Sequence, residues 1–130
     1  MKPSILIIYT GGTIGMRNDA SGVLVPFDFS GIYDEFPALR RLNVNIDAIT
    51  MNPIIDSSNV SPENWCRLAE LIRDNYASYD GFVVLHGTDT MSYTASAMSF
   101  MLENLAKPVV FTGSQIPIDV LRTDGRENLI

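Results

Sequence analysis

Apolar and polar positions fall in blocks along the chain that predict a regular succession of strands and helices. Residues 5–9 (Ile-Leu-Ile-Ile-Tyr), 81–85 (Gly-Phe-Val-Val-Leu) and 109–111 (Val-Val-Phe) are short, continuous apolar runs. Runs of this kind are typical of strands that are buried on both faces, as in a parallel sheet. Residues 44–49 alternate between apolar and polar, which predicts a fourth strand with one more polar face.

Between these runs, apolar residues recur at helical spacing. Ser61 suits an N-cap and Pro62 the first position of a helix, and the stripe that follows consists of Trp65, Leu68, Ala69, Ile72 and Tyr76. A second, methionine-rich stripe consists of Met91, Ala95, Met98, Met101, Leu102 and Leu105. We expect this stripe to be core, and its helix to end at Lys107-Pro108. Residues 29–42, with Pro37 starting or interrupting a turn, and residues 126–130 are also expected to be helical.

Residues 16–30 contain a polar, turn-rich segment without periodicity, and they are predicted to form a long loop. Such loops are often lids or binding loops, and they can equally be idle surface. The position of this segment directly after Thr13 favours a lid.

Strands that alternate with helices predict an α/β fold: a three-layer, Rossmann-like or flavodoxin-like domain with a mainly parallel sheet. The three buried strands each end in a polar turn, after Tyr9, Leu85 and Phe111. Because the carboxyl ends of parallel strands share one edge, these turns should meet there. The residues expected to gather are Thr13, Thr88, Asp89 and Ser114, joined by the Ser57/Ser58 turn.

The turn after the first strand, Thr10-Gly11-Gly12-Thr13-Ile14-Gly15, admits three interpretations. It matches the dinucleotide-binding pattern G-x-G-x-x-G only in part, because Thr10 occupies the first glycine position. It could instead hold Thr13 as a nucleophile, with glycine amides available to an oxyanion. It could also be an ordinary strand-to-loop turn with a buried threonine.

Composition narrows the function classes. The chain has 130 residues, about one domain, and is 46% hydrophobic. A net charge of -6 and the lack of a basic cluster argue against nucleic-acid binding. No run is long enough to span a bilayer, and the apolar start does not resemble a signal peptide. The single cysteine, Cys66, precludes an internal disulfide. A cytoplasmic location without membrane association is therefore the default expectation.

The chemistry-bearing residues are mainly hydroxyls and one carboxylate. Histidine, cysteine and acidic residues show no metal-ligand spacing, so we expect neither a metal nor another cofactor. His86, the only histidine, is either catalytic or a hydrogen-bonded structural residue. Thr88 is a second nucleophile, a relay or a strand-end hydroxyl. Asp89 is a proton acceptor, a ligand for a substrate ammonium or a helix N-cap.

Two motifs resemble signatures of the asparaginase family, and in particular of its type I, cytoplasmic bacterial branch. They are Thr10-Gly11-Gly12-Thr13-Ile14 and residues 85–91, Leu-His-Gly-Thr-Asp-Thr-Met. The resemblance implies hydrolysis of the side-chain amide of L-asparagine to L-aspartate and ammonia. It also implies Thr13 as the nucleophile of an acyl-enzyme, with Thr88 and Asp89 as a second catalytic group. Asp56, Ser57 and Ser58 would bind the substrate α-carboxylate, and Asp89 its α-ammonium.

The chain departs from the family in two respects. Family members carry a tyrosine on the mobile loop that contacts the nucleophile, whereas the aligned position here is Val23, and Tyr33 is the closest tyrosine downstream. Family enzymes are also two-domain tetramers whose catalytic lysine and C-terminal domain lie beyond residue 130. We therefore expect residues 1–130 to be a partial N-terminal asparaginase domain, with an unpaired sheet edge and exposed apolar surface.

Two other functions stay open from the sequence. A non-catalytic amino-acid-binding module would use the same polar rim and would bind asparagine without releasing ammonia. A nucleotide-binding domain would exploit the partial glycine pattern. Asparagine and glutamine differ by one methylene, which is worth only about 1–3 kcal/mol of discrimination, so the sequence does not separate them.

Overall fold

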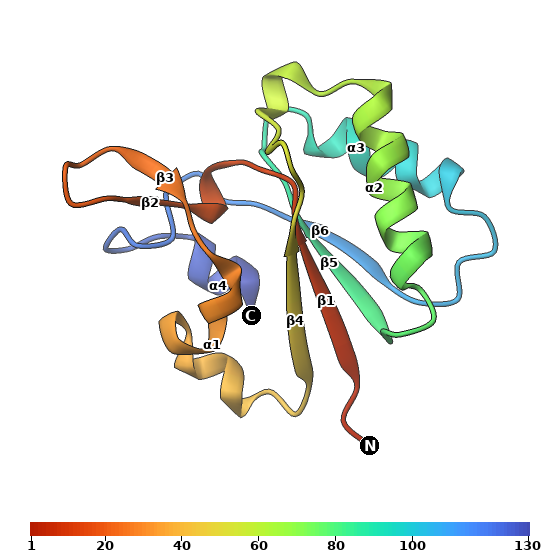
Figure 1. Cartoon of the computed structure of the whole chain (residues 1–130), viewed down its shortest axis with the longest axis horizontal. Coiled ribbons are helices and arrows are strands. Elements are labelled where there is room, and N and C mark those ends of the chain that lie inside the picture. The colour runs from red at the N-terminus through yellow and green to blue at the C-terminus, as the bar shows by residue number, and fades with distance from the viewer.

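Four parallel strands form the central sheet of the computed structural model, which describes residues 1–130 (Figure 1). The strands are β1 (Ser4–Tyr9), β4 (Asn45–Thr50), β5 (Gly81–Leu85) and β6 (Val109–Thr112), in the order β4-β1-β5-β6. β1 lies inside the sheet, where Ile7 pairs with Ala48 on one side and Val83 on the other. All four strands were predicted to within one residue at each end.

Helices cover both faces of this sheet. On one face lie α2 (Pro62–Asn75) and α3 (Met91–Met101), and on the other lie the short helices α1 (Ile32–Glu35) and α4 (Gly125–Leu129) (Figure 1). The 3-10 segments are η1 (Thr13–Gly15), η2 (Phe29–Gly31), η3 (Pro37–Arg41) and η4 (Ser57–Asn59). The predicted three-layer α/β architecture is confirmed.

Alternation along β1 creates two separate cores. Leu6 and Ile8 point to the face covered by α2, where they join a cluster that includes Leu68 and Ile72. Successive strand residues point to opposite faces, so Ile7 and Tyr9 belong to the other cluster. The remaining buried members of that second cluster are Ile14, Phe27, Phe29, Ile32, Phe36, Leu39, Leu85 and Ile118.

The ends of the two long helices follow local sequence, with one correction. α2 begins as predicted, because Ser61 and Asn64 form a capping box ahead of Pro62. The prediction that the second helix continues to Lys107 is wrong, since α3 ends at Met101 and Asn104 adopts φ 54°. A left-handed residue cannot continue a right-handed helix, and asparagine tolerates that conformation.

The methionine stripe is consequently only partly core. Met98 is buried, whereas Met101 is 40% and Leu105 43% exposed. Both lie at or beyond the end of α3, where the helical spacing that predicted their burial no longer applies.

The prediction of a long loop without regular structure elements over residues 16–30 is also wrong, since two strands lie within it. β2 (Met16–Asn18) and β3 (Leu24–Pro26) pair antiparallel as a hairpin, with Arg17 opposite Val25. The Asp19 carboxylate accepts bonds from the amides of Ser21 and Val23, and Gly22 has φ 82°. This tight side-chain-stabilised turn holds strands too short to produce a recognisable alternation.

Residues 29–42 are helical only in short pieces, because Phe36 leaves α1 with ψ 72° and Pro37 opens η3.

The expected unpaired edge is present: β6 pairs only with β5, and Val110 is 53% exposed. No helix combines the length and the apolar character needed to cross a bilayer.

Candidate active site

The candidate site lies at the carboxyl ends of β1 and β5, in the middle of the sheet. From β1 the chain moves outward to β4, and after crossing back to β5 it moves outward the other way to β6. The strand order therefore reverses between β1 and β5. Ligands of open α/β sheets bind in the crevice at such a switch point.

The first turn is shaped by glycine and anchored to β5. Gly11 and Gly12 have φ 146° and 92°, and a Cβ on Gly11 would lie 1.9 Å from the carbonyl oxygen of Ile55. Only glycine fits such a conformation and such a close approach. Thr10 fixes the start of the turn, because its amide and its hydroxyl both donate to Leu85 O, at 3.0 and 2.8 Å. Thr13 follows, half-buried, as the first residue of η1.

Three turns meet behind Thr13. A Cβ on Gly12 would lie 2.5 Å from Cα of Gly87, and a Cβ on Gly87 would lie 2.4 Å from Oγ of Ser57. Thr90 also donates its hydroxyl to Ser57 O, at 2.7 Å. The turns after β1 and β5 are thus in backbone contact, and the η4 turn joins them through the side chains of Ser57 and Thr90, as the shared-edge argument predicts.

Thr88 and Asp89 differ in their surroundings. Thr88 is half-buried, and its Oγ1 accepts a bond of 3.1 Å from Nε2 of Gln115. Asp89 is exposed. It does not cap the following helix: the N-cap of α3 is Thr90, which makes no side-chain capping bond. The N-cap alternative for Asp89 is therefore wrong, and its carboxylate faces solvent beside Thr88.

The turn after β6 reaches Thr88 through a different residue from the one predicted. Ser114 is buried and donates its hydroxyl to Ile116 O at 2.8 Å, so it serves its own loop. Gln115 contacts Thr88 instead, and sequence reasoning missed it, although it directly follows the polar Thr-Gly-Ser turn. Asp124 holds this loop, and the amide of Gln115 is the largest cause of the lowered pKa of that carboxyl.

The η4 turn presents three polar side chains differently. Asp56 accepts from the amide of Ser58 at 3.1 Å and so caps η4. Asp56 and Ser58 are exposed, while Ser57 is 6% exposed and packs against Gly87. Of these side chains, Ser57 lies closest to the glycine turns.

His86 is buried, and both ring nitrogens are hydrogen-bonded within the chain. Its Nδ1 bonds to Gly87 O at 2.7 Å, and its Nε2 bonds to Oγ1 of Thr94 at 2.9 Å. Burial is the main cause that lowers the pKa of this imidazole. These contacts favour the structural interpretation of His86 over the catalytic one.

Val23 supplies no phenol at the position aligned with the family tyrosine, and the phenols of Tyr9 and Tyr33 are both engaged in hydrogen bonds. Val23 lies at the turn of the β2–β3 hairpin and is 58% exposed. The phenol of Tyr9 donates to Gly12 O at 3.0 Å, and burial raises its pKa to about 12, which keeps it protonated at neutral pH. Tyr33 accepts from the amide of Ile46, near the amino end of β4.

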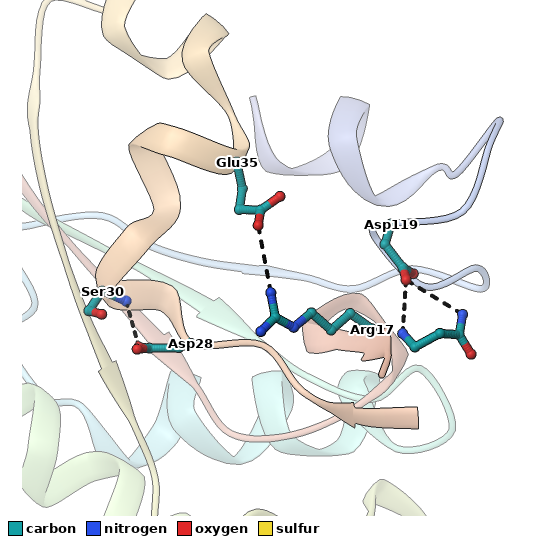
Figure 2. Close-up of polar contacts among 6 residues, drawn as sticks. Arg17, Asp28, Ser30, Glu35 and Asp119 are labelled. Carbon is teal, nitrogen blue, oxygen red and sulfur yellow. Dashed lines mark hydrogen bonds and ion pairs between the residues drawn. The ribbon is translucent and has the colours of Figure 1, made fainter. Parts of the chain in front are cut away.

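Polar contacts tie the hairpin to the rest of the domain (Figure 2). The amide of Asn18 donates to Asp119 at 2.8 Å, and Arg17 pairs with Glu35 at 3.7 Å. Asp28 caps η2 by accepting from the amide of Ser30 at 2.9 Å. The hairpin is thus bound on one side to the loop after β6 and on the other to α1. No group of three histidine, cysteine or acidic side chains is placed to hold a metal ion.

Comparisons with known proteins agree with this geometry. The family model described as "Asparaginase, N-terminal" matches residues 4–130. L-asparaginase 1 of Escherichia coli K12 is 50% identical over 136 residues, which span 99% of this chain and 39% of that protein.

Two solved structures are similar as well. L-asparaginase I of Vibrio cholerae has a TM-score of 0.88 at 46% identity, over 99% of this chain and 39% of that one. A probable cytoplasmic L-asparaginase of Campylobacter jejuni has a TM-score of 0.79 at 36% identity, over 98% of this chain and 38% of that one. The chain thus spans about two fifths of the length of these proteins. It belongs to the asparaginase family, whose N-terminal domain it matches.

Proposed function

We propose that residues 1–130 form the nucleophile-bearing, N-terminal part of an L-asparaginase that hydrolyses the side-chain amide of L-asparagine. The observation that carries this proposal is the backbone contact between Gly12 and Gly87, which sets the turn of Thr13 against the turn of Thr88. Family membership and similarity to L-asparaginases support it. Because the chain spans 39% of the E. coli relative, activity of the whole protein belongs to the proposal.

In the proposed reaction, Oγ1 of Thr13 attacks the amide carbonyl of the substrate. The new C–O bond forms an ester, the C–N bond breaks, and ammonia leaves with the proton given up by the threonine. Water then attacks the ester, releases aspartate and returns a proton to Thr13. Amides of the glycine turns are suitable donors for the oxyanion that forms in each step.

Thr88 is proposed to help remove the proton from Thr13 or from water. Since Gln115 donates to Oγ1 of Thr88, the hydroxyl hydrogen of Thr88 is free to be directed to another acceptor. Val23 lies at the hairpin turn and the raised pKa of Tyr9 keeps that phenol protonated, so we assign the proton transfer to Thr88.

The substrate zwitterion is proposed to bind between two polar groups. The exposed carboxylate of Asp89 is suited to the α-ammonium, and Thr88 borders the same position. The turn formed by Asp56, Ser57 and Ser58 is suited to the α-carboxylate through its hydroxyl groups. The contact of Ser57 with Gly87 supports this pairing of the two turns.

Ammonia release from asparagine and from glutamine tests the proposal. It should be measured on this chain and on a polypeptide extended to the length of the relatives. We expect slow or no turnover by residues 1–130 alone and turnover by the longer form. Thr13→Ala should abolish turnover while leaving asparagine binding partly intact, whereas Ser99→Ala, which removes an exposed hydroxyl on α3, should be neutral.

Full turnover by Thr13→Ala would refute Thr13 as the nucleophile. Calorimetry on the longer form separates the remaining alternatives. Asparagine binding without ammonia release would identify a binding module, and measurable affinity for NAD or ATP would identify a nucleotide-binding domain. We also propose a cytoplasmic homotetramer: the resemblance supports both properties, and the C. jejuni neighbour, named a probable cytoplasmic L-asparaginase, supports the location. Sedimentation analysis of the longer form and cell fractionation test these two properties.

A further inference from the structure

The hydrogen bonds of His86 define which ring nitrogen carries the proton. A carbonyl oxygen can only accept, so Nδ1 must donate to Gly87 O across 2.7 Å. In the neutral ring Nε2 is then an acceptor, and the hydroxyl of Thr94 donates to it across 2.9 Å. Burial of both side chains, and the lowered pKa of His86, favour this neutral form.

Trp65 extends the chain of hydrogen bonds by one step. Its indole Nε1 is a donor only, and it donates to Oγ1 of Thr94 across 3.0 Å. The three bonds therefore run in one direction, from Trp65 through Thr94 and His86 to Gly87 O. The donors come from α2, from α3 and from the end of β5, so two helices are connected to the main chain of the glycine turn.

The last bond determines how the peptide between Gly87 and Thr88 is oriented. In a planar trans peptide the carbonyl oxygen and the following N–H point in opposite directions. His86 draws the oxygen of Gly87 toward the buried side, so the amide of Thr88 points the other way. That amide donates to no backbone carbonyl of the chain. Since glycine tolerates many conformations, Gly87 alone would not hold this orientation.

We propose that His86 is a positioning residue, held by Thr94 and Trp65, that orients the Gly87–Thr88 peptide toward the substrate. The role rests on the proposed function in one respect, namely that the substrate binds beside Thr88 and Asp89. His86 itself is buried and bonded on both sides, so it acts through the main chain and does not touch the substrate.

A matched pair of substitutions at Thr94 tests this role. Thr94→Val keeps the shape of the side chain but removes the hydroxyl, whereas Thr94→Ser keeps the hydroxyl. We expect Thr94→Val to lower kcat by about tenfold or more, because small displacements of reacting groups have effects of that order. KM should change little, and Thr94→Ser should retain kcat to within about threefold. The rates are taken per folded molecule, on the polypeptide extended to the length of the relatives.

A second pair addresses His86 directly. The side-chain amide nitrogen of His86→Asn can occupy the place of Nδ1 and donate to Gly87 O, whereas His86→Gln reaches the place of Nε2 and loses that donor. His86→Asn should therefore keep more of kcat than His86→Gln. A merely structural histidine would instead lower stability in both variants and leave kcat per folded molecule unchanged. Equal kcat values in the two variants, or full kcat in Thr94→Val, would overturn the proposal.

Nitrogen-15 NMR supplies a readout that needs neither turnover nor the variants at His86. In the unsubstituted chain the ring should be the neutral tautomer with hydrogen on Nδ1, and Thr94→Val should shift the Thr88 amide resonance. Hydrogen on Nε2, or an unmoved Thr88 resonance, would refute the hydrogen-bond chain even if the protein hydrolyses asparagine. Conversely, the NMR result stands if the protein proves to bind asparagine only.

Discussion

Alanine at Gly12 is the sharpest test of the contact between the two glycine turns. The new Cβ would lie 2.5 Å from Cα and 2.6 Å from N of Gly87, and both are backbone atoms that cannot rotate away. Gly12 also has φ 92°, which costs an L-residue about 1–2 kcal/mol. Overpacking adds about 1–3 kcal/mol, so we expect Gly12→Ala to lower the free energy of unfolding by about 2–5 kcal/mol.

Two other glycines separate the two contributions. Gly22 has φ 82° but open space around its Cβ position, so Gly22→Ala should cost only the conformational penalty, about 1–2 kcal/mol. Gly31 has open space and φ -95°, so Gly31→Ala should be neutral or slightly stabilising. Urea unfolding of the three variants, followed by circular dichroism, measures the series under one set of conditions.

The order of the three free energies of unfolding tests whether the two glycine turns are in contact. If Gly12→Ala is no more destabilising than Gly22→Ala, the turns after β1 and β5 are not in contact, and the proposed site has no structural basis. An equal loss in Gly31→Ala would mean that the assay reports a general effect of added methyl groups. Asparagine binding should be weakened in Gly12→Ala and unchanged in Gly31→Ala, measured on the longer polypeptide.

Three further predictions concern stability. Because folding lowers the pKa of His86, the unfolded chain binds more protons at weakly acidic pH. The free energy of unfolding should therefore fall as the pH drops below 6.5, the ordinary pKa of histidine. This dependence should vanish in His86→Gln, and urea unfolding at several pH values would check both results. Leu68→Ala in the core beneath α2 should lower the free energy of unfolding by about 2–5 kcal/mol, whereas Cys66→Ala, at an exposed position, should leave it almost unchanged. Equal shifts of the melting temperature in the two variants would contradict the core assignment. Asp119→Ala removes the acceptor of Asn18, so proteolytic cleavage within residues 16–26 should become roughly fivefold faster, and an unchanged rate would show that the hairpin is held elsewhere.

The strands and the meeting of their turns could be predicted because each depends on strong local signals. Continuous apolar runs mark the buried strands, and parallel topology alone brings their carboxyl ends together. Thr13, Thr88 and Ser57 accordingly lie on turns that are in contact. Their roles rest on the family resemblance and stay predictions.

Other features depend on side-chain bonds that spacing does not reveal. The hairpin is held by Asp19, which accepts from two amides, and α3 ends where Leu102 leaves the helical conformation with ψ 83°. Ser114 and Gln115 are neighbours in the same turn, and only the direction of each side chain decides which one meets Thr88. A linear pattern contains no information about that direction.

The division of the interior into two clusters by the sheet has a consequence for motion. The cluster beneath α2 and α3 is enclosed by continuous helices, whereas the opposite one is enclosed by 3-10 turns, a hairpin and helices of four or five residues. Short segments with few internal bonds open at lower free-energy cost. Deuterium uptake should therefore be fast in the hairpin and slow in α2. The strand ends that form the candidate site would then have a rigid layer on one face of the sheet and a more mobile layer on the other.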